Sequence, residues 1–262
     1  MNYVVVCLVA CGASMLTFFS GFGLGTLLLP VFAVFLPLPV AIAATALVHL
    51  ANNLFKLGLV GKYADRRLVV RFGVPAALAA SAGAWLLLRL AALPPLATYR
   101  LGDRTVAVLP LGLVLGVLIA GFALAELLPN LAARRFDARL LPLGGVLSGF
   151  FGGLSGHQGA LRAAFLVKSG LDPQTFVGTG VACAVIVDVV RLGVYGASAL
   201  RGHLAALGDG DGIGLVVAAT LAAFVGAWSG RRLLHKMTVR LVQVVVGILL
   251  LLLAFGIGAG IL

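Results

Sequence analysis

Two glycine-rich segments interrupt long apolar stretches of this chain, and they lie 135 residues apart. The first is SGFGLG at 20–25 and the second is SGHQGA at 155–160. Inside a membrane, such a break leaves backbone N–H and C=O groups without helical partners, so it is stable only where protein or a wet cavity surrounds it. Matched breaks in the two halves of a membrane protein indicate a binding site near the middle of the bilayer.

The composition supports a location in the membrane. Of the 262 residues, 62% are hydrophobic and 10% are charged, and the mean hydropathy is +1.17. Soluble domains carry about 25% charged residues. The net charge of +11 does not indicate nucleic-acid binding, because most basic residues lie in short loops between apolar segments, where they report topology.

Six segments are long and apolar enough to cross the bilayer as helices, which takes about 20 residues. Two further segments, 3–36 and 142–169, carry the breaks and are less regular. A shift of 135 residues superposes the two halves and indicates an internal duplication. We expect a first repeat at 1–130, a linker at 131–141 and a second repeat at 142–262. The expected spans are 39–61, 69–90, 106–128, 174–199, 211–231 and 239–262.

Positive charge distinguishes two topologies, because Lys and Arg are enriched in cytoplasmic loops. If both broken segments cross the membrane, the loop Lys and Arg residues divide 8 to 8 between the two faces. If each segment instead enters and returns, they divide 12 to 4, which the rule favours. The sequence therefore predicts an all-α polytopic protein of the inner (plasma) membrane, with two inverted repeats. Each repeat would contain a Gly-broken re-entrant helical hairpin and three transmembrane helices, with the linker cytoplasmic and both termini outside.

The second break carries three candidate functional side chains, His157, Gln158 and Arg162. Ionisable groups inside a bilayer cost about 2.5–3.5 kcal/mol each on insertion scales and are functional candidates for that reason. Gln158 and Arg162 lie one turn apart, so they share a helix face. With the N–H groups at the start of that helix, the guanidinium favours an oxyanion. The alternatives are that Arg162 pairs with a helix C-terminus or with Asp188, and that His157 is a packing residue.

The glycines of both breaks are candidate binding residues through their backbone. Glycine permits unusual dihedral angles and a close approach of ligand to N–H groups, although helix packing explains any single glycine equally well. The glycines concerned are Gly21, Gly23, Gly25, Gly156 and Gly159.

Two apolar helices carry matching polar stripes. His49, Asn53 and Lys56 follow an i, i+4, i+7 spacing, and the shift of 135 residues places Asn53 on Asp188 and Lys56 on Arg191. We expect Lys56 and Arg191 to hold an anion near opposite mouths of a transport path, and all five residues to belong to the binding site. The alternatives are that Lys56 snorkels to the membrane surface and that Arg191 only forms an ion pair with Asp188.

The broken segments, the duplicated halves and the run GGLSGHQGALR at 152–162 resemble the sulfite exporter TauE/SafE family over about 3–262. Many members carry a Gly-Gly-Gly-Pro-like stretch in each half. Here Gly23-Leu24-Gly25, with Pro30 downstream, stands in the first half, and 157–159 stands in the second. The resemblance implies a transporter of sulfur-containing anions such as sulfite, sulfoacetate or related organosulfonates, usually outward.

We therefore predict a transporter, not an enzyme, that exports a small sulfur-containing anion such as sulfite or an organosulfonate by alternating access at a midplane site. We expect no cofactor and no metal; the partners are the anion and the lipid bilayer, and a homodimer is left open. The first alternative is a cation or metal transporter that uses Asp188 and the carbonyls of the broken helices. An intramembrane enzyme is disfavoured because no GxSxG elbow is present, and a scaffold would leave the buried cations unexplained.

Overall fold

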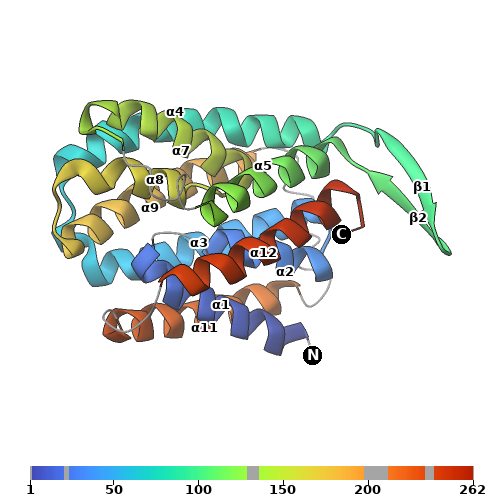
Figure 1. Cartoon of the computed structure of the whole chain (residues 1–262), viewed down its shortest axis with the longest axis horizontal. Helices are drawn as coiled ribbons and strands as arrows, with labels where there is room; N and C mark the ends of the chain where they lie inside the picture. The colour runs from blue at the N-terminus through green and yellow to red at the C-terminus, as the bar shows by residue number, and fades with distance from the viewer. Residues whose placement is uncertain (1, 21–23, 129–135, 198–211, 234–238, 262) are drawn as a thin grey trace.

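The protein is a helical bundle from which a two-stranded hairpin projects (Figure 1). The computed structural model describes residues 2–20, 24–128, 136–197, 212–233 and 239–261. The helices of the first half are α1 (Asn2–Ser20), α2 (Leu24–Phe35), α3 (Leu38–Val60), α4 (Arg66–Ala91) and α5 (Pro110–Leu127). Those of the second half are α7 (Leu141–Ser155), α8 (Gly159–Leu166), α9 (Pro173–Ala197), α11 (Gly212–Leu233) and α12 (Val239–Gly258). Short 3-10 helices are η1 (Gly61–Tyr63), η2 (Ala138–Leu140) and η3 (Val167–Ser169).

Within the described residues, four helices are long and apolar enough to cross a membrane. They confirm four of the six expected spans and support an α-helical membrane protein. The four are Leu38–Tyr63, Arg66–Ala91, Pro173–Gly196 and Gly212–Gly230. The sixth expected span, 239–262, is occupied by α12 as far as Gly258.

The expected span 106–128 was wrong at its N-terminal end. Strand β1 (Ala97–Leu101) pairs antiparallel with β2 (Arg104–Val108), with Ala97 opposite Val108. Gly102, at φ +61°, supplies the left-handed conformation in the turn between the strands. The helix therefore begins only at Pro110, which lies in the first turn of α5, where a missing N–H costs no helical hydrogen bond.

The start of α4 is fixed by a side-chain cap. Asp65 accepts a hydrogen bond from the N–H of Leu68 at 3.0 Å and so pairs one of the free donors of the first turn. The N–H of Asp65 itself donates to Oγ1 of Thr179 at 2.9 Å, which ties α4 to α9.

Glycines bring α7 against α4 over most of its length. Gly145, Gly149 and Gly153 recur every four residues along one face of α7, and a Cβ on any of them would overlap a carbonyl oxygen of α4. Small residues allow such backbone contact between helices in lipid. Helix packing therefore explains these three glycines.

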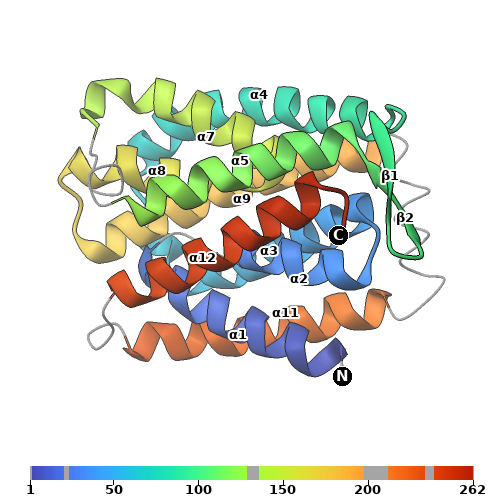
Figure 2. The same ribbon diagram turned by 45° about the vertical axis from the view of Figure 1, so that its right-hand side comes forward.

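Helix α1 begins and helix α12 ends at the same end of the bundle, on the right in Figures 1 and 2. Helix α1 begins and helix α2 ends at this right-hand end. Helix α7 begins and helix α8 ends at the opposite, left-hand end. The end of α1, the start of α2 and the turn between α7 and α8 therefore lie inside the bundle, away from both of its ends.

Candidate functional site

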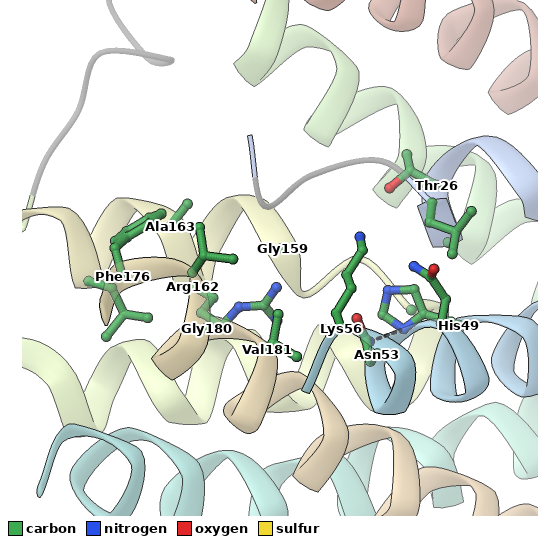
Figure 3. A pocket seen from close by; sticks show the side chains of 16 residues that line it. Thr26, His49, Asn53, Lys56, Gly159, Arg162, Ala163, Phe176, Gly180 and Val181 are labelled. Carbon is green, nitrogen blue, oxygen red and sulfur yellow. Dashed lines mark hydrogen bonds between the residues drawn. The ribbon is translucent and has the colours of Figure 1, made fainter. Parts of the chain in front are cut away.

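The two glycine breaks meet inside the bundle. A Cβ on Gly25, at the start of α2, would lie 3.5 Å from the carbonyl oxygen of Gly156, which follows α7. The same Cβ would lie 3.5 Å from Cδ2 of His49 on α3. Segments from the two halves of the chain thus form one wall of a cavity of about 50 Å³ (Figure 3).

The cavity is enclosed by α2, α3, α8, α9 and the second break. Its charged lining residues are Lys56 and Arg162, and none of the described residues that line it is a carboxylate. Figure 3 shows these two side chains extending from α3 and from α8 into the same space. The lining residues are Leu24, Gly25, Thr26, His49, Asn52, Asn53, Lys56, Gly156, Gly159, Arg162, Ala163, Leu166, Phe176, Val177, Gly180 and Val181.

Gly156 ends α7 in a conformation that favours glycine. Its φ is +81°, and its N–H donates to the carbonyl oxygen of Gly152 at 3.0 Å, which closes the last turn. A Cβ at this position would lie 2.8 Å from Nη1 of Arg191. The hydroxyl of Ser148 donates to the carbonyl oxygen of Gln158 at 2.9 Å and ties the break back to α7. Two hydrogen bonds to α7 therefore fix the backbone of the second break, one at Gly156 and one at Gln158.

Lys56 is held inside the bundle by a neighbour on its own helix. The side-chain amide of Asn52 is oriented so that both its oxygen and its nitrogen form hydrogen bonds. The oxygen accepts from Nζ of Lys56 at 3.2 Å, and the nitrogen donates to the carbonyl oxygen of Ala223 at 3.2 Å. Lys56 is only 3% exposed. The alternative that Lys56 snorkels to the membrane surface is therefore wrong.

Asp188 on α9 is the centre of a buried hydrogen-bond network. Its Oδ1 accepts from Nε2 of Gln158 at 3.1 Å and forms an ion pair with Nη2 of Arg191 at 2.9 Å. Its Oδ2 accepts from Nδ2 of Asn53 at 2.8 Å and lies 2.7 Å from Nδ1 of His49. Both carboxylate oxygens are thus occupied by protein donors, which argues against the alternative of a cation site at Asp188.

Arg162 is connected to this network through one amide. Its Nη1 donates to Oε1 of Gln158 at 3.1 Å, and the other end of that amide donates to Asp188. The predicted shared face of Gln158 and Arg162 is therefore confirmed. Gln158 orients the guanidinium at the cavity while Asp188, which does not line the cavity, orients Gln158.

The buried part of the described chain has an excess of positive charge. Its charged side chains are the cations Lys56, Arg162 and Arg191 and the single carboxylate Asp188. Asp188 is in direct contact with Arg191, so the two charges that border the cavity are both positive. A site built in this way attracts anions and repels cations.

The structure brings most of the predicted binding residues together. Seven of them line the cavity, and four others are buried without lining it. Gly21 and Gly23 lie outside the described residues. The seven are Gly25, His49, Asn53, Lys56, Gly156, Gly159 and Arg162, and the four are His157, Gln158, Asp188 and Arg191.

His157 lies apart from the cavity. Its ring stacks on that of Phe122 of α5 with centroids 5.5 Å apart, and its Nδ1 lies 3.0 Å from the carbonyl oxygen of Ser155. These contacts are those expected of a packing residue. They do not support the prediction that His157 contacts the substrate.

Sequence reasoning missed several lining residues. Thr26 directly follows the first break and Asn52 adjoins the predicted stripe, so a wider search around each motif would have found them. Phe176 and Gly180 lie near the start of α9 and carry no such signal. They line the cavity because α9 crosses α8 there.

Comparison with known proteins agrees with this architecture. The family model described as Sulfite exporter TauE/SafE matches residues 6–257, nearly the whole chain. No curated protein and no solved structure matches the chain. The match includes both breaks and all the residues that line the cavity. The chain therefore belongs to the sulfite exporter TauE/SafE family.

Proposed function

We propose that the protein exports a small sulfur-containing anion, such as sulfite or an organosulfonate, across the inner membrane. The family supplies the general class, a membrane transporter of sulfur anions. The observation that supports an anion in this particular chain is the excess of buried positive charge at the cavity. Burial of charge costs several kcal/mol per ion, and a bound anion offsets that cost.

Two cations, one from α8 and one from α3, would bind the anion. Arg162, oriented by Gln158, presents a planar guanidinium whose N–H groups match the oxygens of an oxyanion. Lys56 presents a compact ammonium group from α3. The N-terminus of α8, which begins at Gly159, adds a partial positive charge at the same wall. Asn53 and His49 complete the polar lining.

Asp188 and Arg191 would position these ligands and would not touch the anion. Asp188 holds His49, Asn53 and Gln158 through its two oxygens. Arg191 balances the charge of Asp188 and donates toward the carbonyl oxygen of Gly152 at 3.4 Å. This role differs from the expectation that Arg191 holds an anion near one mouth of the path.

The size of the cavity favours a small anion. A buried water needs roughly 10–15 Å³ of cavity volume. The cavity of about 50 Å³ therefore accommodates a few waters. Sulfite, with four non-hydrogen atoms, is of that size. An organosulfonate is larger and would require α8 or α9 to move outward.

The arrangement of the helix pairs supports inverted repeats, 1–130 and 142–262, and alternating access. The pairs α1–α2 and α7–α8 open toward opposite ends of the bundle, as two re-entrant hairpins inserted from opposite faces would. Asn53 and Asp188, which are equivalent under the shift of 135 residues, are hydrogen-bonded to each other. Such a contact is expected where a two-fold axis relates the repeats.

The membrane potential would then drive export. The end of the bundle at which α4 begins carries Arg66, Arg67 and Arg71, so we assign it to the cytoplasm and assign both termini to the outside. With the cytoplasm negative by 100 mV, each negative charge that leaves gains about 2.3 kcal/mol.

Flux into proteoliposomes tests this proposal. Purified protein should move labelled sulfite, and empty liposomes should not. Arg162→Ala removes at least one hydrogen bond to a charged ligand, which contributes about 1.5–3 kcal/mol, and should weaken anion affinity at least about 10- to 150-fold. Arg139→Ala, in η2, removes an equal charge from an exposed site and should change little.

Two results would contradict the proposal. One is that the reconstituted protein moves neither sulfite nor an organosulfonate. The other is that Arg162→Ala and Arg139→Ala transport equally well, which would show that the cavity does not bind the transported ion.

A further inference from the structure

His49 connects the buried carboxylate to the cavity. Its Nδ1 lies 2.7 Å from Oδ2 of Asp188, which is fully buried, while its own side chain is 12% exposed and lines the cavity. The Nε2 edge of the ring faces Gly25, where a Cβ would lie 3.9 Å from Nε2. Figure 3 shows the imidazole at the edge of the cavity beside Asn53.

The hydrogen bonds of Asp188 determine which nitrogen of His49 carries the proton. Asp188 is held as a carboxylate by its ion pair with Arg191 and by hydrogen bonds from Gln158 and Asn53, so it has no proton to give. The short contact with His49 must therefore be donated by Nδ1–H. The 3.1 Å approach of Asn53 Nδ2 to the same nitrogen is then a contact without a hydrogen bond, because a protonated Nδ1 has no lone pair.

Neutral His49 therefore presents a lone pair, not a donor, to the cavity. Within the described part of the chain, no hydrogen bond is made to Nε2. An anion oxygen placed there would face another lone pair and be repelled. A proton between Nε2 and the anion oxygen converts this repulsion into a charge-assisted hydrogen bond. The bond is the same whether the proton is assigned to the ring or to the anion.

We infer that each anion is bound together with one proton, which lies between Nε2 of His49 and an oxygen of the anion. This inference rests on the proposed function, and it adds a coupling ion and the residue that binds it. His157 does not bind this proton, because its ring packs on Phe122 and does not line the cavity. Asp188 does not bind it either, because both of its oxygens accept hydrogen bonds from protein donors.

The other charged groups that face His49 come from three helices. Asp188 and Arg191 lie on α9, Arg162 lies on α8, and Lys56 lies about two turns further along α3. The two guanidinium groups stay protonated. Lys56 is the competing proton site, because a buried lysine that is a neutral amine in the empty cavity would take up a proton when an anion binds. The experiment must therefore separate His49 from Lys56.

Co-binding of a proton changes the charge that crosses the membrane in each cycle. A dianion carried with one proton moves one negative charge outward instead of two. Export remains downhill in the membrane potential, at about half the electrical driving force of the bare dianion.

Titration calorimetry of the purified full-length protein with sulfite tests this inference. Binding is measured at mildly alkaline pH, where free sulfite is deprotonated, in two buffers that differ in ionisation enthalpy. We expect uptake of about one proton per anion and a Kd that rises about tenfold per pH unit, as one linked proton requires. In His49→Gln, uptake should fall close to zero and the pH dependence should disappear. The matched control His157→Gln should keep both.

Each other outcome overturns the inference in a distinguishable way. Sulfite binding without proton uptake in the wild type contradicts it and leaves the proposed function standing. Loss of uptake in Lys56→Met, with full uptake in His49→Gln, assigns the proton to Lys56 and overturns it. If wild-type protein neither binds nor transports sulfite or an organosulfonate, the proposed function fails as well. A charge-to-anion ratio of two in wild-type proteoliposomes also contradicts the inference and needs no variant.

Discussion

Helices α4 and α7 are in such close contact that one added methyl group at their interface should push them apart. In Gly149→Ala, the new Cβ would overlap the carbonyl oxygen of Ala76 on α4. Both atoms belong to rigid helices, so neither can give way by a rotamer change. The helices must move apart by something on the order of an ångström, and the loosened contacts run along the whole pair. Ser148, the adjacent residue, bonds to the second break, so the shift extends to the cavity.

The expected loss of stability follows from two opposing effects. Alanine gains up to about 1 kcal/mol over glycine in a helix interior. Overpacking of a tight contact costs about 1–3 kcal/mol, with backbone overlap at the upper end. We expect Gly149→Ala to lower the free energy of unfolding by about 2 kcal/mol.

Reversible unfolding in mixed detergent micelles measures this change. The matched control is Gly193→Ala on α9, where a new Cβ would meet no atom within 4 Å. The control should be neutral or gain up to about 1 kcal/mol. The two variants should therefore differ by about 2–3 kcal/mol, or about 30- to 150-fold in the unfolding equilibrium. Equal stability of the two variants would show that α4 and α7 are not in backbone contact.

Two further variants test other contacts. Tyr195→Phe removes a buried 2.6 Å hydrogen bond to the carbonyl oxygen of Gly153 and should cost about 1 kcal/mol in the same assay; unchanged stability would contradict the contact. Asp172→Ala should lower the melting temperature at neutral pH. Hydrogen bonds from the Thr175 hydroxyl and backbone hold the pKa of Asp172 below its usual value, so its contribution is present above the unfolded-state pKa and is lost as pH falls through the folded-state pKa. A deficit that persists in acid would refute this cause.

Features that lie on one helix were predictable from the sequence. His49, Asn53 and Lys56 line one cavity because their spacing alone places them on one face of α3. The pair Gln158 and Arg162 follows from the same periodicity. The breaks were visible because glycine, serine and polar residues interrupt otherwise apolar segments.

Features that depend on how helices cross were not predictable. The sequence placed Asp188 in a stripe with Arg191 on one helix. Its other partners, His49, Asn53 and Gln158, come from α3 and from the second break, so its central position depends on how these segments pack against α9. The hairpin of β1 and β2 had a local signal, Gly102 and Asp103 between short apolar runs. Residues 106–108 are apolar and directly precede the apolar sequence of α5, so hydrophobicity alone places the start of the helix too early.

The hydrogen bond between Asn53 and Asp188 has a consequence for how such a chain can arise. Two separate, identical subunits in the same arrangement would set this position against its own copy. Two aspartates would then repel each other, and two asparagines would supply no charge to hold an arginine. Under the two-fold relation proposed above, only a single chain that contains both repeats can carry an amide on one side and an acid on the other. The asymmetric bond between Asn53 and Asp188 is then possible in such a chain and impossible between two identical subunits.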